Sequence, residues 1–159
     1  MLYAQGIYLL PLGPKYRVYL KGSLARCFGL KPKETSGAII HVGYNFDPDK
    51  PSLVIVPDEN AKYLLEQTFE IDLENFDDMP TDDDESKSKR MSEFRQVEIK
   101  SRKIQFQKNE INHLNLAKDE KQVIFYGRST SFIVWSESEF AKRYPREYRK
   151  VQEDEPDET

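Results

Sequence analysis

The chain has 159 residues, 33% of them charged and 38% hydrophobic, and its formal net charge is −4. This length supports one domain or two half-size ones, and no run of about 18 apolar residues is present, so no membrane span is expected. A single cysteine, Cys27, cannot form an internal disulfide, and the start lacks a signal-peptide pattern, so a cytoplasmic protein is expected.

The first part of the chain predicts a strand, a short helix and a hairpin. Alternating apolar residues predict a strand over 17–20. A short helix is expected over 23–28, and it ends at Gly29, a residue type that tolerates the left-handed conformation of a helix C-cap. Two apolar runs, 38–44 and 52–56, flank a loop rich in turn residues, which predicts a β-hairpin.

An acidic segment follows the closing helix of this first half, which is expected to begin near Pro57. Residues 70–85 hold nine acids and no base, and residues 153–159 hold five acids and no base. The other 136 residues carry 24 bases and 14 acids, a net charge of about +10. We expect a solvated linker at 70–91 and a solvated tail at 151–159; the alternative is an internal mimic of DNA that competes for basic surfaces.

The second part of the chain predicts the same elements again. A strand is expected over 103–106, and a short helix over 109–114 that ends at Asn115. A second hairpin is expected, with strands over 121–127 and 131–135 joined by a tight loop.

The two parts match when one is shifted along the other. The shift that places Val18 on Ile104 also aligns the classes of the surrounding residues. Each part ends with a closing helix, the second with Ser136 as its N-cap. This internal repeat predicts an α+β, mainly β fold in which half-domains 1–69 and 92–150 share one core about a pseudo-twofold axis, because neither half can bury both faces of its hairpin alone.

The order of strand, short helix and hairpin behind a basic turn resembles the AbrB-type swapped-hairpin domain. Two such copies, each followed by a helix, resemble the MraZ family of bacterial transcriptional regulators over about residues 1–145. The most specific match is VIFYGRSTSFIVWSESEF at 123–140, which resembles the family's second hairpin. The resemblance implies a nucleoid-associated regulator of a bacterial operon for division and cell-wall genes, without a cofactor, that binds promoter repeats as a ring oligomer.

The basic turns that precede the two strands are candidate DNA contacts. The first, 13–17, reads GPKYR, and the second, 100–103, reads KSRK and is one residue shorter. Both lack the Asp of the family's turn. We expect the two turns on one side of the molecule, where they can reach double-stranded DNA together. The predicted DNA-binding residues are Lys15, Arg17, Arg26, Lys100, Arg102 and Lys103.

Apolar positions that are expected to be exposed on the closing helices exceed what one small core needs, which predicts a homo-oligomer through these helices. These residues are Tyr63, Leu64, Leu65, Phe69, Phe140 and Tyr144.

Two classes of function stay open at this stage. The retained Arg17 and the positive balance outside the acidic segments favour a DNA-binding regulator. The missing Asp residues and the Gly13-Pro14 pair favour a ring-forming interaction protein whose DNA-binding turns have decayed. The basic stretch 141–150 is either a solvated helix end or a second surface for phosphates.

No phosphate-binding loop, dinucleotide motif or nucleophile motif is present, so an enzyme is not expected. His41 and His113 are expected to be structural rather than metal ligands. Trp135 is expected to anchor the core.

Overall fold

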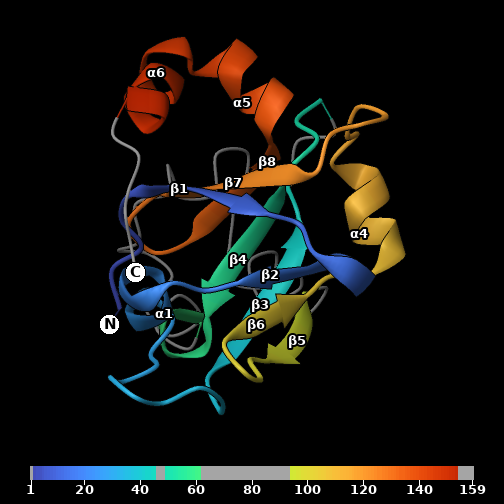
Figure 1. Ribbon diagram of the computed structural model, residues 1–159. Helices are drawn as coiled ribbons and strands as arrows, with labels where there is room; N and C mark the ends of the chain where they lie inside the picture. The colour runs from blue at the N-terminus through green and yellow to red at the C-terminus, as the bar shows by residue number, and fades with distance from the viewer. Residues whose placement is uncertain (1, 46–48, 62–93, 154–159) are drawn as a thin grey trace, which may run out of the picture.

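The computed structural model describes residues 2–45, 49–61 and 94–153 (Figure 1). The fold is α+β and mainly β. Its larger sheet has six antiparallel strands in the order β1-β7-β8-β4-β3-β5, and β2 pairs with β6 in a separate two-stranded sheet, here called the ribbon.

The strands are β1 (Ile7–Pro11), β2 (Arg17–Tyr19), β3 (Ile39–Tyr44), β4 (Leu53–Pro57), β5 (Arg95–Glu98), β6 (Lys103–Gln105), β7 (Gln122–Gly127) and β8 (Phe132–Ser136). The helices are the 3-10 turn η1 (Pro14–Tyr16), α1 (Gly22–Cys27), α4 (Lys108–His113), α5 (Glu137–Arg143) and α6 (Pro145–Glu153). A further helical segment occupies 58–61.

The predicted strands and short helices are present, and their bounds lie within about one residue of those expected. Pro57 differs, because it ends β4 instead of lying in the helical turn that follows. The predicted acidic linker at 70–91 lies outside the described residues. Helix α6 continues to Glu153, past the predicted boundary at 150.

The predicted helix ends are also found. Gly29 and Asn115 have φ angles of 97° and 57°, in the left-handed region. The hydroxyl of Ser136 accepts a hydrogen bond from the backbone N–H of Glu139 at 3.1 Å, which caps α5. These local signals fix where each helix begins or stops.

Strand pairing interlocks the two parts of the chain. The hairpin β3–β4 joins the hairpin β7–β8 through β4 and β8, with Val54 opposite Ile133. Strand β1 pairs with β7, and β5 pairs with β3, so each lead-in strand completes the hairpin of the other part. In the ribbon, Val18 lies opposite Ile104, the residue on which the repeat places it.

The six-stranded sheet carries a buried apolar cluster on each face. One cluster lies between the sheet and a layer made of the ribbon, α1 and α4, and includes Phe28 and Phe106. The other lies under α5 and α6, where Trp135 and Phe140 are fully buried. Figure 1 shows α5 and α6 beyond β7 and β8, on the side away from the ribbon. Trp135 is the core anchor that the sequence predicted.

The structure corrects one part of the argument for self-association. Phe140, expected to be exposed on a closing helix, is 0% exposed because it packs against Tyr126 and Tyr144. Tyr144 is half-buried and also contacts Trp135. The other residues offered for self-association, Tyr63, Leu64, Leu65 and Phe69, lie outside the described residues.

Within the described ranges, no helix combines the length and the apolar character that crossing a membrane requires.

We expect Phe140→Ala to lower the free energy of unfolding by about 3–5 kcal/mol, because the substitution leaves a cavity under α5. Urea unfolding at several protein concentrations measures this. Tyr3→Ala, at a residue that is 65% exposed, is the matched control and should change the value by less than about 0.5 kcal/mol. A small loss in Phe140→Ala combined with weaker self-association would show that Phe140 serves an interface between copies.

Candidate nucleic-acid interface

The ribbon has one buried face and one exposed face. Val18 and Ile104 point into the core and are 0% exposed. Because successive side chains of a strand alternate between faces, the neighbours of these two residues point outward. The outer face therefore carries Arg17 opposite Gln105 and Tyr19 opposite Lys103.

Tight turns lead into both ribbon strands. In the first turn, the N–H of Gly13 donates to the carbonyl of Arg17 at 2.7 Å, and Pro14–Tyr16 lie between them. In the second turn, the N–H of Lys103 donates to the carbonyl of Lys100 at 2.9 Å, and only two residues lie between them. The second turn is one residue shorter, as the sequence predicted.

Each turn holds two consecutive residues with positive φ that are not glycine. They are Lys15 and Tyr16 at 60°, and Ser101 and Arg102 at 54° and 57°. The left-handed conformation costs roughly 1–2 kcal/mol for each such residue. Strain of this kind is often found at functional sites, because the surrounding structure must hold it in place.

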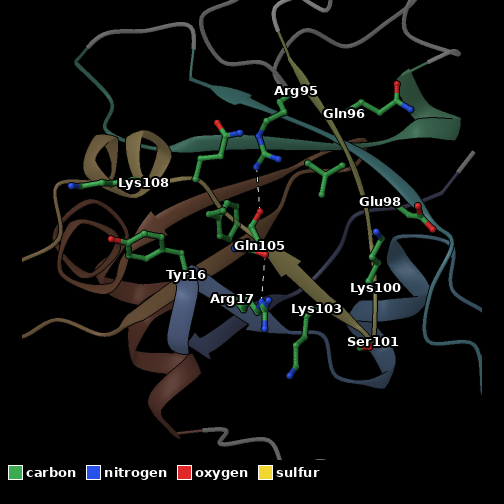
Figure 2. Close-up of a pocket in the computed structure, with 13 residues that line it drawn as sticks. Tyr16, Arg17, Arg95, Gln96, Glu98, Lys100, Ser101, Lys103, Gln105 and Lys108 are labelled. Carbon is green, nitrogen blue, oxygen red and sulfur yellow. Dashed lines mark hydrogen bonds between the residues drawn. The ribbon is translucent and has the colours of Figure 1, made fainter.

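Residues from both turns line one groove between β5 and β6, with a volume of about 790 Å³. Its lining includes the cations Arg17, Arg95, Lys100, Lys103 and Lys108. The lysines are exposed and have no ion-pair partner among the described residues. Glu98 also lines the groove, but its side chain points away from Arg17 and Gln105 (Figure 2).

A hydrogen-bonded row crosses this groove. Arg95 binds the carboxylate of Glu110 through two nitrogens, at 2.7 and 3.0 Å, and donates to the carbonyl oxygen of Gln105 at 3.2 Å. Arg17 donates from Nε to the side-chain oxygen of Gln105 at 3.5 Å. Figure 2 shows Arg95, Gln105 and Arg17 in this order. The row thus links β5, β6 and β2.

Glu110 is the buried end of the row, with a side chain that is only 6% exposed. It also accepts the backbone N–H of Gln107 at 2.8 Å, which completes a capping box at the start of α4. A buried carboxylate is strongly unfavourable unless a cation and hydrogen bonds satisfy it. Arg95 supplies both, so the pair fixes the end of β6 relative to α4.

The structure brings together only some of the predicted DNA-binding residues. Arg17, Lys100 and Lys103 line the groove, and Lys15 is exposed in the first turn. Arg26 is exposed on α1 and does not line the groove. Arg102 is turned toward the loop at 34–35, where its Nε donates to the carbonyl of Glu34 at 3.2 Å.

Sequence reasoning missed Arg95, Gln105 and Lys108. The alternation that places Lys103 on the outer face of the ribbon also places Gln105 there, so this signal was available. Arg95 had a weaker signal, because its role depends on the burial of Glu110, which the sequence alone does not give.

The two histidines make local contacts. His41 binds Asp58 at 2.8 Å. The ring of His113 lies 4.5 Å from that of Tyr44, between centroids, and burial lowers the pKa of His113. Burial therefore favours the neutral form of His113, the last residue of α4.

Comparison with known proteins gives no match: no family description fits the chain, and no curated protein is significantly similar to it.

We expect Arg95→Met to lower the free energy of unfolding by about 3–5 kcal/mol, because it leaves the Glu110 carboxylate buried without a cation. Arg95→Met combined with Glu110→Leu should recover most of this loss, since well-packed apolar residues can replace a buried ion pair. About 1 kcal/mol should stay lost, because leucine cannot accept the capping hydrogen bond from Gln107. Urea unfolding of both variants tests this. Equal losses in the single and double variants would contradict the role given to the pair.

Proposed function

We propose that this protein is a DNA-binding transcriptional regulator of the MraZ type, and that the outer face of the ribbon enters the major groove of DNA. The observation that carries the proposal is the exposed ribbon face with Arg17, Gln105 and Lys103 on it, flanked by exposed lysines that form no ion pair within the described part of the chain. The major groove admits a two-stranded β-ribbon, and its base edges are read by side chains of these types.

The register of the strands supports a duplicated, swapped-hairpin architecture. The ribbon is centred on Val18 and Ile104, which the sequence repeat aligns with each other. An antiparallel pair centred on equivalent residues is what a twofold axis between two copies produces. The exchange of β1 and β5 between the hairpins is what swapping predicts.

The distribution of charge supports contact with phosphates. Lys15, Lys100 and Lys108 lie beside the ribbon and are exposed. Lysines in such positions bind phosphate oxygens and fix the register of a protein on DNA, whereas side chains on the ribbon face discriminate bases. The net charge of −4 does not oppose this, because half of the 28 acids fall in 70–85 and 153–159.

One observation favours the alternative, an interaction protein with decayed turns. Arg102 lies in the second turn, but its side chain is held by the carbonyl of Glu34. A turn that directs its arginine toward its own protein offers fewer contacts to DNA. The first turn has no such contact at Lys15 among the described residues, so we place DNA binding first.

We expect several copies to act together on DNA, because one ribbon covers too few base pairs for strong specificity. Light scattering with a promoter fragment that contains repeated sites should show more than one copy of the 18.7 kDa chain on each duplex. A single copy per duplex at saturating protein would contradict this expectation.

We expect Arg17→Ala to weaken binding by roughly 1–3 kcal/mol per contact and to relax sequence preference, because Arg makes bidentate contacts to a base. Lys103→Ala should weaken binding to all sequences about equally. Fluorescence anisotropy with the duplex upstream of the protein's own gene, at several salt concentrations, measures both effects.

The matched control is Lys118→Ala, at an exposed lysine in the turn between α4 and β7 that does not line the groove, which should bind as the unchanged protein does. If the unchanged protein has no salt-dependent affinity for any duplex, the interaction-protein function replaces the regulator.

A further inference from the structure

We infer that Arg17 and Gln105 form one base-reading unit for a guanine and an adenine at neighbouring positions, and that Arg95 and Glu110 position it. This inference rests on the proposed DNA binding and adds the sequence that is read. It also adds two residues, Arg95 and Glu110, that act through Gln105 instead of touching DNA.

The reading unit follows from the register of the ribbon. Arg17 and Gln105 lie directly opposite each other on the outer face. Side chains opposite each other in an antiparallel pair start only about 5 Å apart, so they reach neighbouring base pairs. Arg is suited to the O6 and N7 acceptors of guanine, and Gln to the N6 donor and N7 acceptor of adenine.

The hydrogen bond between the two side chains leaves both able to read bases. Arg17 uses Nε to contact the side-chain oxygen of Gln105, at 3.5 Å. Both terminal nitrogens of the guanidinium remain for guanine. The oxygen of Gln105 has a second lone pair for the adenine amino group, and the amide nitrogen of Gln105 can donate to N7. The contact therefore orients the pair without using its reading atoms.

The other half of the ribbon presents different chemistry. The pair related to Arg17 and Gln105 by the proposed twofold axis is Lys103 and Tyr19. Lys is a point charge that cannot make the bidentate contact, and Tyr19 is 51% exposed. Consequently the half with Arg17 and Gln105 discriminates bases and the half with Lys103 and Tyr19 does not, and the preferred site is asymmetric instead of palindromic.

Arg95 and Glu110 hold the unit in place. The backbone carbonyl of Gln105 points away from β2 and accepts from Arg95 at 3.2 Å, while Glu110 holds Arg95 from the α4 side. Among the described residues, Arg95 is the side chain that donates to this carbonyl, on the edge of β6 that faces away from β2. Positioning of this kind affects discrimination more than total affinity, because phosphate contacts come from other residues.

The experiment is selection of bound duplexes from a randomised library, with the full-length protein and four variants. Sites selected by the unchanged protein should contain neighbouring G and A in an asymmetric pattern. Gln105→Ala should keep the preference for G and reduce the preference for A by roughly 5- to 50-fold. Arg17→Ala should keep the preference for A and reduce the preference for G by a similar factor.

The third variant, Arg95→Met with Glu110→Leu, separates positioning from folding, because the apolar pair is expected to recover most of the stability that Arg95→Met alone loses. It should reduce both preferences by roughly 3- to 10-fold while affinity for a non-cognate duplex stays within about twofold. Lys118→Ala is the fourth variant and should select the same sites as the unchanged protein.

The outcomes distinguish this inference from the function on which it rests. Salt-dependent binding without a G and A preference, or an unchanged preference in Gln105→Ala, overturns the reading unit and leaves the regulator standing. If the Arg95 and Glu110 variant loses affinity for the selected and the non-cognate duplexes by the same factor, the positioning role of these two residues is overturned. Absence of binding to every duplex overturns both the inference and the proposed function.

Discussion

The pairing of β4 with β8 is the contact on which the rest of the molecule depends, because it joins two hairpins into one sheet. A two-stranded hairpin alone is marginally stable in water. Strands β4 and β8 are buried along their whole length, which requires apolar cover on both faces of the joined sheet. The ribbon layer covers one face and α5 with α6 cover part of the other, so the ribbon is held in place by the same burial that stabilises the sheet.

This arrangement explains how a short ribbon can present polar side chains on its outer face. Each of its strands has only three residues, too few to be stable alone. The central residues Val18 and Ile104 supply the burial, and the flanking positions are left for polar side chains. Each of the two turns holds two consecutive residues with positive φ. The packed core on the inner face offsets the conformational cost of these four residues. The residues proposed to contact DNA are therefore ones that the core does not need.

The sequence predicted the fold elements well because each has a local cause. Period-two alternation defines the strands, and Gly29 and Asn115 end their helices through their backbone preference. Phe140 was misplaced because an apolar residue on a helix does not reveal whether its partner is its own sheet or another copy. Arg95 was missed because its partner Glu110 lies in another element, and only the packing of β5, β6 and α4 makes the carboxylate a buried one.

The Arg95–Glu110 pair is informative because the repeat aligns Glu110 with Leu24, which is also buried. The first part of the chain fills this position with an apolar residue, so burial there does not require a charge. Replacing a buried ion pair by apolar residues is often neutral or stabilising, and stability alone therefore does not account for the pair. The ion pair adds a directed hydrogen bond, because Arg95 donates to the carbonyl of Gln105 and a leucine cannot. The difference between the two halves thus lies at the residues that set the geometry of the ribbon face, where a difference in recognition would be produced.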